Sequence, residues 1–203
     1  MRNLKIIKPD LIVALILILA LILPVHTTAE ESRNYMAEII TALTAGDVDH
    51  ARILNAERNA KIDSMDYCPH PKIDTWDLWL VSKIVQQEAG SSWLTDEHQQ
   101  LVASVLINRV NSPEFLDTVE KCVFQKGQYA GVTSSRFANL KPSERAVKNA
   151  LIILERGSIA PSSVIFQSNY SRLGSGHYLV IRDRYLVTTY FAYSNNLELY
   201  EEG

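Results

Sequence analysis

Glu88 is the acidic residue of this 203-residue chain whose surroundings are most typical of a catalytic carboxyl group. It follows Ile84 by four residues and Val85 by three, so it extends the apolar stripe of a helix that we expect to end at Gly90. The carbonyl groups of a helix end disfavour an ionised carboxylate, and partial burial beside Trp93 would act in the same direction. A carboxyl group that keeps its proton at neutral pH suits a general acid. The alternative for Glu88 is a surface glutamate at a frayed helix end.

Other kinds of chemistry find little support in the residue types. The eight glycines form no phosphate-binding motif, and the five histidines lack the spacing of metal ligands. A formal charge of −3 lacks the basic excess of a nucleic-acid binder. We therefore expect no metal, no cofactor and no nucleic-acid partner. Cys68 and Cys122 leave two alternatives open, a disulfide that an exported protein would permit or two unpaired thiols.

Apolar spacing and capping residues predict the elements that position Glu88. Four helices are expected, from Asp74 or Thr75 to Gly90, over about 96–110, from Ser112-Pro113 to about Gln125, and over about 142–156 with a stop at Gly157. Stretches rich in β-branched and aromatic residues at 163–167, 177–181 and 185–190 predict short antiparallel strands. The fold class is therefore α+β, a mainly helical domain with a small C-terminal antiparallel sheet. Asn108 lies in the middle of its helix, and we interpret it as a buried bracket.

The chain divides into three segments. In residues 1–29, the uncharged run 11–23 follows three basic residues and precedes small residues at 27–29, which is typical of a secretory signal peptide. An uncleaved membrane anchor through residues 11–23 is the alternative. Residues 30–72 predict a helical stalk or spacer with a thin apolar stripe, which either holds the next domain away from a membrane or packs on its flank. Residues 73–203 form the working domain, and the protein acts outside the cytoplasm.

Several motifs of the working domain resemble the bacterial cell wall hydrolase family of the SleB type, which includes spore cortex-lytic transglycosylases. The resemblance covers about residues 79–193. In order along the chain, the motifs are Glu88-Ala89-Gly90, Asn108-Arg109-Val110, Phe115-Leu116, Gln128-Tyr129, the helix Ala146–Gly157 and Gly176-His177-Tyr178. The resemblance implies a lysozyme-like or transglycosylase-like fold.

The first of these motifs departs from the family pattern, which is Glu-Ala-Arg-Gly-Glu. The arginine is absent, and Ser91-Ser92 stands where the second glutamate would be. The connection that follows is also longer, with residues 93–97 as the insertion. If the chemistry needed two carboxylates, this chain would be inactive or would recruit Asp96 or Glu97.

The resemblance implies a role for Glu88 that needs no second carboxylate. In a lytic transglycosylase, one glutamate protonates the oxygen between N-acetylmuramic acid and N-acetylglucosamine, then accepts a proton from the C6 hydroxyl that closes a 1,6-anhydro ring. An activated water and its carboxylate base, usual in hydrolysing glycosidases, are then dispensable. We expect Gln128 and Tyr129 to bind acetamido groups and stack on sugar faces, and Asn169 and His177 to line the far wall. Loop packing and structural hydrogen bonding are their alternatives.

The sequence therefore predicts an exported peptidoglycan-cleaving glycosidase whose partner is the glycan strand, with a lytic transglycosylase favoured over a muramidase. The alternative from another class is a non-catalytic peptidoglycan-binding or wall-assembly protein, which the missing second glutamate would explain. A zinc amidase is disfavoured because the histidines do not cluster.

Overall fold

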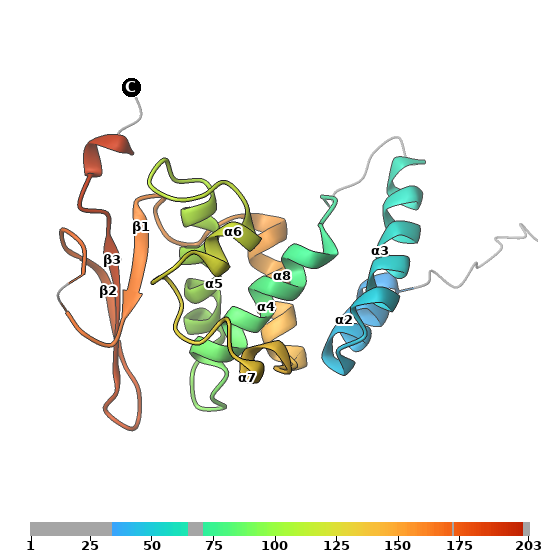
Figure 1. The fold of residues 1–203 in the computed structure, drawn as a ribbon, viewed down its shortest axis with the longest axis horizontal. Coiled ribbons are helices and arrows are strands. Elements are labelled where there is room, and N and C mark those ends of the chain that lie inside the picture. Colours follow the sequence, from blue (N-terminus) through green and yellow to red (C-terminus); the bar gives the residue numbers. More distant parts are fainter. Residues whose placement is uncertain (1–33, 65–70, 172, 201–203) are drawn as a thin grey trace, which may run out of the picture. The chain divides into compact units, whose positions relative to one another are not determined.

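The computed structural model describes residues 34–64, 71–171 and 173–200 of the chain. The predicted signal or anchor segment 1–29 and Cys68 lie outside these residues. The predicted fold class is confirmed, because the described part is mainly helical and carries a small antiparallel sheet near its C-terminal end (Figure 1). Its elements are α2 (Tyr35–Ala45), α3 (Val48–Asp63), α4 (Thr75–Ala89), α5 (Asp96–Val110), α6 (Val119–Phe124), α7 (Ser135–Ala138), α8 (Glu144–Arg156), β1 (Val164–Ser168), β2 (His177–Arg182), β3 (Thr188–Tyr193) and the short 3-10 helix η1 (Leu197–Leu199).

Capping side chains start the long helices where the sequence predicts. Asp74 Oδ1 accepts hydrogen bonds from the backbone N–H groups of Trp76 and Asp77, at 2.8 and 3.0 Å, and so caps α4. Thr95 caps α5 and Ser143 caps α8 in the same manner. Helix α8 ends at Gly157, whose φ of 89° lies in the left-handed region that glycine tolerates best.

The three strands form an antiparallel sheet in the order β1-β3-β2. The third strand begins three residues later than the predicted 185–190, because the carboxylate of Asp183 organises a turn there. Its Oδ1 accepts hydrogen bonds from the backbone N–H groups of Tyr185 (2.8 Å) and Val187 (2.9 Å), and Leu186 between them has a φ of 66°. Residues 183–187 are therefore the β2–β3 turn, and the predicted strand start is corrected.

The predicted helix start at Ser112-Pro113 is wrong, since α6 begins only at Val119. Glu114, which lies in the intervening turn, instead holds the C-terminal segment. Its carboxylate accepts hydrogen bonds from the hydroxyls of Ser194 and Tyr200 (the latter 2.8 Å) and from the amide of Asn196 (2.6 Å). These partners are more than 75 residues away in the sequence, so local propensity contains no signal for them.

The hydrogen bonds of Glu114 with the C-terminal segment make the free energy of unfolding depend on pH. Desolvation opposes ionisation of Glu114, but the hydrogen bonds from Ser194, Tyr200 and Asn196 outweigh it and hold the pKa of the carboxyl group below its ordinary value of 4.5. A depressed folded-state pKa stabilises the fold above that ordinary value, and this contribution is lost as the pH falls through the folded-state pKa. We expect Glu114→Gln to be less stable than wild type in urea at pH 6, and the difference to shrink at pH 3. A constant difference at both pH values would contradict this explanation.

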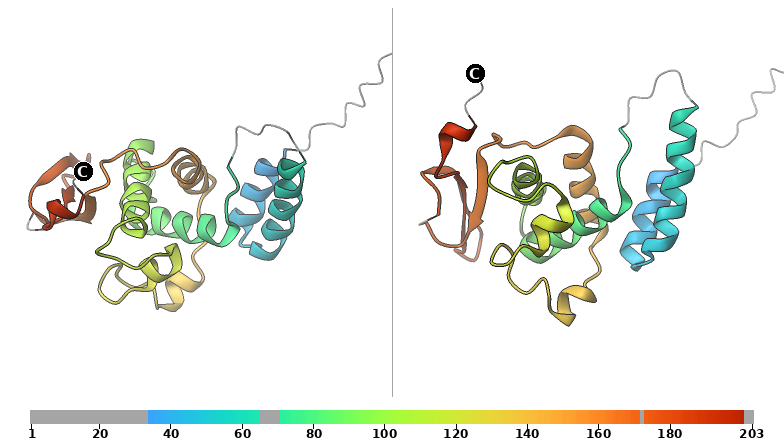
Figure 2. Two further views of the ribbon diagram at one scale, coloured as in Figure 1. Left: turned by 90° about the horizontal axis from the view of Figure 1, so that it is seen from above. Right: turned by 45° about the horizontal axis from the view of Figure 1, so that its top comes forward.

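The core lies between α4, α5 and α8, with β1 packed on α5. In the views of Figure 1 and Figure 2, the sheet lies on one side of these helices and the α2–α3 pair on the other. Asn108 is the bracket that the sequence predicts, because its buried amide donates to the carbonyl oxygens of Pro161 (2.7 Å) and Val164 (3.0 Å). It therefore ties α5 to the start of the sheet.

Helices α2 and α3 pack against α8 and α4. Leu43 and Leu54 are buried in the same core cluster as α4 and α8. The amide of Asn55 donates to the carbonyl oxygen of Ile73 (2.6 Å) and to Thr75 Oγ1 (2.9 Å) at the start of α4. The described part of the predicted stalk thus packs on the flank of the helices that follow, while the domain boundary near residue 72 stays a prediction.

Candidate active site

The last turn of α4 carries Glu88 to the surface. Helix α4 is buried from Leu78 to Val85, and its core-facing side continues with Ala89. The side chain of Glu88 is exposed, so the partial burial that its place in the apolar stripe predicts is wrong. The stripe turns out of the core over the final turn, where the polar run Gln86, Gln87 and Glu88 faces a pocket.

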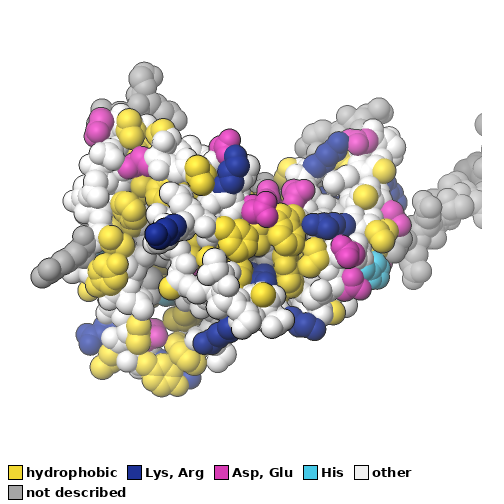
Figure 3. Space-filling view, viewed as in Figure 1, with side chains coloured by type: hydrophobic (Ala, Val, Ile, Leu, Met, Phe, Trp, Pro, Cys, Tyr) yellow, Lys and Arg dark blue, Asp and Glu magenta, His cyan; other side chains and the backbone are white. Residues whose placement is uncertain are grey.

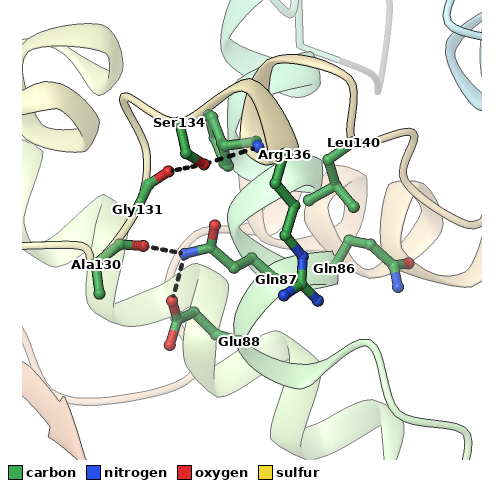
Figure 4. A pocket seen from close by; sticks show the side chains of 9 residues that line it. Gln86, Gln87, Glu88, Ala130, Gly131, Ser134, Arg136 and Leu140 are labelled. Atoms are coloured by element: carbon green, nitrogen blue, oxygen red, sulfur yellow. Dashed lines mark hydrogen bonds between the residues drawn. The ribbon is translucent and has the colours of Figure 1, made fainter.

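This pocket has a volume of about 520 Å³. Pockets of this size accommodate small organic ligands. Figure 4 shows it between the end of α4 and the segment that leads into α7. Its lining consists of Gln86, Gln87, Glu88, Ala130, Gly131, Ser134, Arg136, Phe137 and Leu140.

Gln87 connects Glu88 with the opposite wall of the pocket. Its amide Nε2 donates to Glu88 Oε1 at 2.9 Å and to the carbonyl oxygen of Ala130 at 3.0 Å (Figure 4). One oxygen of the Glu88 carboxyl group is thereby held by the amide. The proton of a protonated Glu88 then belongs on Oε2, because Oε1 already accepts a hydrogen bond.

Helix α7 contributes an apolar side chain, Phe137, and a basic side chain, Arg136, to the lining of the pocket. Ser134 Oγ accepts from the backbone N–H of Phe137 at 3.2 Å and so caps α7. The buried amine of Lys83 supports this helix from below, since it donates to the carbonyl oxygen of Ala138 at 3.1 Å and lies 4.5 Å from the centre of the Phe137 ring. Burial lowers the pKa of Lys83. The Arg136 side chain extends from α7 toward α4 (Figure 4), so a cation borders the pocket.

A chain of amides fixes the end of α4. The buried Gln99 donates from Nε2 to the carbonyl oxygen of Ala89 at 2.9 Å, next to Glu88. Gln99 Oε1 accepts from the amide of Asn149 on α8, which also donates to Asp96 Oδ1, each at 2.9 Å. The position of the Glu88 turn therefore depends on polar contacts with α5 and α8.

The carboxylate of Asp96 is hydrogen-bonded to this chain of amides, so it is not free to act as a second catalytic carboxylate. Arg145 Nε donates to Asp96 Oδ1 at 2.6 Å, beside the hydrogen bond from Asn149. Hydrogen bonds from Asn149 and Arg145 lower the pKa of Asp96. Glu97 is exposed and does not line the pocket of Glu88.

Tyr129 is buried, with 6% of its surface exposed. The guanidinium carbon of the buried Arg109 lies 5.0 Å from the centre of the Tyr129 ring and 5.2 Å from that of Phe115. Arg109 Nε also donates to the carbonyl oxygen of Ile165 at 2.7 Å. The predicted stacking on a sugar face does not fit Tyr129, because its ring packs against a cation inside the protein. Burial raises the pKa of its phenol.

The other predicted binding residues do not line the pocket beside Glu88. Gln128 is half-buried, and Asn169 is exposed just after β1. His177 is exposed at the start of β2, where its Nε2 is hydrogen-bonded to the carbonyl oxygen of Ser171 at 3.0 Å and its ring lies 4.8 Å from that of Tyr190. The structure therefore brings none of these three residues into the pocket of Glu88.

Gln87, Gln99 and Arg136 were not predicted from the sequence. A polar Gln86-Gln87-Glu88 run at the end of an apolar helix is a local signal for Gln87. Gln99 and Arg136 have no such signal, because their importance comes from contacts with distant segments.

Cys122 is a free, buried thiol that donates to the carbonyl oxygen of Leu116, with an Sγ to O distance of 2.8 Å. Desolvation raises its pKa. Within residues 34–64, 71–171 and 173–200, no three His, Cys, Asp or Glu side chains are grouped to hold a metal ion. None of the helices in those same ranges has the length and apolar character to cross a membrane.

The geometry defines a mainly helical α+β protein with one carboxylic acid at the mouth of a pocket. Residues 95–178 match the family model described as Cell Wall Hydrolase. Residues 95–178 therefore contain a cell wall hydrolase domain, the kind of domain that the sequence motifs predict. The matched segment begins after Glu88, which therefore lies outside it. The comparison with curated proteins found no match, and neither did the comparison with solved structures.

Proposed function

We propose that the protein is an exported lytic transglycosylase that cleaves the bond between N-acetylmuramic acid and N-acetylglucosamine, with Glu88 as its acid and base. One observation carries this proposal. Glu88 is the only acidic side chain among the described residues that line the pocket. A single carboxyl group suits a reaction that recruits no water, whereas glycosidases that use water employ two carboxyl groups.

The arrangement supports a two-step proton transfer. Protonated Glu88 donates from Oε2 to the bridging oxygen as that bond breaks, and positive charge develops on the muramic sugar. The hydrogen bond from Gln87 to Oε1 stabilises the carboxylate that results. The carboxylate then takes the proton of the C6 hydroxyl, whose oxygen attacks C1 and closes the 1,6-anhydro ring. Glu88 ends the cycle protonated, so protons balance without a cofactor.

A further proposal concerns the position of the protein in the cell. The match of residues 95–178 to the cell wall hydrolase family supports action outside the cytoplasm. We propose that residues 1–29 direct export, either as a cleaved signal peptide or as an anchor through residues 11–23.

The second candidate function is non-catalytic binding to peptidoglycan. It is favoured by the serines at positions 91 and 92, where the family pattern has its second glutamate. The family match also begins only at residue 95, so that comparison does not support a catalytic role for Glu88.

Mass spectrometry of purified peptidoglycan after digestion by the full-length protein tests the proposal. A lytic transglycosylase gives 1,6-anhydromuramic products and no new reducing ends. New reducing ends without anhydro sugars would replace it with a muramidase. Sedimentation with peptidoglycan but no products, on walls of several kinds, would replace it with the binding function.

Gln87 gives a prediction at the same site. Gln87→Leu removes the donor that holds both Glu88 and Ala130, and we expect the rate of product formation to fall about tenfold, the equivalent of one hydrogen bond to a charged group. Gln87→Glu places a like charge beside the carboxylate and is expected to lower the rate at least as much. Both rates are measured by release of anhydro products, with the melting temperature as the folding control. Unchanged rates in folded variants would contradict a positioning role.

A further inference from the structure

An exposed aromatic cluster lies at the β2–β3 turn, apart from the residues that line the pocket. The side chains of Trp93 and Tyr185 are 41% and 58% exposed. Their ring centres are 4.8 Å apart and the rings are almost perpendicular, at 76°. In Figure 3, hydrophobic side chains gather at the end of this hairpin with basic side chains beside them. We call Trp93, Asp183, Arg184 and Tyr185 the hairpin platform.

Polar contacts hold the rings of the platform in place. The indole Nε1 of Trp93 donates to Asp183 Oδ2 at 3.0 Å, which ties the loop after α4 to the sheet. The guanidinium of Arg184 lies 5.6 Å from the Trp93 ring centre and 4.9 Å from that of Tyr185, and its Nη2 donates to the Tyr185 hydroxyl at 3.0 Å. Aromatic groups that are fixed yet exposed mark a binding surface, since burial would otherwise be favoured.

The chemistry of the platform suits an acidic glycan. Aromatic rings pack against the apolar faces of sugar rings, and their fixed geometry lowers the entropy cost of binding. Arg184 in the turn and the exposed Arg182 at the end of β2 add positive charge to this surface. Peptidoglycan carries sugar rings together with the carboxylates of its lactyl groups and peptides, so its charge complements this surface.

Part of the hairpin platform lies close to Glu88 along the chain. Trp93 lies in the short loop between α4 and α5, five residues after Glu88, and Arg145 Nη2 anchors this loop by donating to the carbonyl oxygen of Leu94 at 2.6 Å. Trp93 precedes the segment that matches the family model, and Asp183 to Tyr185 follow it. Both halves of the platform are therefore outside the matched segment, and Trp93 lies in the predicted insertion 93–97.

We propose that the hairpin platform is a glycan-binding surface that holds a peptidoglycan strand beside the end of α4. Sugar rings pack on Trp93 and Tyr185, and Arg184 binds carboxylates of the strand. The choice of strand rests on the proposed function, but binding itself does not require cleavage.

Sedimentation with purified peptidoglycan tests the platform in the full-length Glu88→Gln protein, which keeps cleavage out of the measurement. Trp93→Ala and Arg184→Ala are each expected to weaken binding roughly tenfold, as stacking residues do in other polymer-binding sites. The matched control is Arg52→Ala, because Arg52 lies over Trp76 at 5.5 Å in the same kind of pair on α3 and α4. This control is expected to bind as the parent does.

A second variant keeps the test decisive if Trp93→Ala fails to fold. Tyr185→Ala leaves the hydrogen bond between Trp93 and Asp183 in place and is expected to weaken binding as well. Equal binding by folded platform variants and the parent would overturn the proposal. Binding of the platform to phosphatidylglycerol vesicles in place of peptidoglycan would overturn it in favour of a membrane-facing hairpin. Platform binding without any cleavage by wild type would refute the proposed enzyme and leave the platform standing.

Discussion

Glu88→Gln is expected to lower the rate of glycan cleavage by about 10²–10⁴-fold, the usual contribution of general acid–base catalysis. Glutamine keeps the size of the side chain and can still accept the hydrogen bond from Gln87. It cannot give a proton to the bridging oxygen or receive one from the C6 hydroxyl. The variant should therefore still bind peptidoglycan while its rate of product formation falls. Sedimentation measures the binding, and mass spectrometry of the digest measures the products.

The matched control for Glu88→Gln is Glu97→Gln. Glu97 is an exposed carboxylate in the first turn of α5, outside the pocket of Glu88. We expect this variant to cleave at the wild-type rate. Loss of activity in Glu97→Gln, or full activity in Glu88→Gln, would transfer the role of acid away from Glu88.

Gln99→Leu is expected to lower the free energy of unfolding by about 3 kcal/mol, because it removes the hydrogen bonds that Gln99 makes with two buried polar groups. The carbonyl oxygen of Ala89 loses its donor, and the amide of Asn149 loses one of its two acceptors. Leucine is similar in volume to glutamine, so the loss reflects polar groups more than packing. Urea denaturation followed by circular dichroism measures the change.

Gln100→Leu provides the control for Gln99→Leu. Gln100 is a half-exposed neighbour that donates to Asn149 Oδ1 at 2.8 Å, so water can replace part of its hydrogen bond. We expect it to cost less than half as much as Gln99→Leu. Equal losses for both variants would show that the buried amide of Gln99 has no special importance for α4.

Elements set by local chemistry were predictable from the sequence. Asp74 starts α4 with its own carboxylate, and Gly157 ends α8 in a conformation that suits glycine. Both effects act within a few residues, so the sequence contains the whole cause. The α+β class follows, since long helical periodicities precede three strand-like segments.

Elements set by distant contacts were not predictable. Glu114 stands where a helix is expected, but it binds Ser194, Asn196 and Tyr200 instead. Residues 185–187 look like a strand, yet Asp183 folds them into a turn. In both places a carboxylate takes partners that propensity does not consider.

The candidate site likewise contains features that local sequence predicts and features that depend on distant contacts. The place of Glu88 on its helix was predictable from spacing, and its exposure was not, because that depends on where α4 leaves the core. The contact of Gln87 with Ala130 joins residues 43 positions apart, so it needs the fold. Tyr129 was predicted to stack on a sugar because a phenol in a loop at the cleft suits that contact, but its burial against Arg109 depends on α5.

The polar links among Asp96, Gln99 and Asn149 also bear on evolution. Asn149 donates to both of the other side chains, and Gln99 passes the connection on to Ala89. A change at any one of these positions removes a hydrogen bond from a buried side chain, whereas a joint change can keep the three side chains matched. Among descendants of this sequence, positions 96, 99 and 149 should therefore covary. The neighbouring position 97 should drift independently of them.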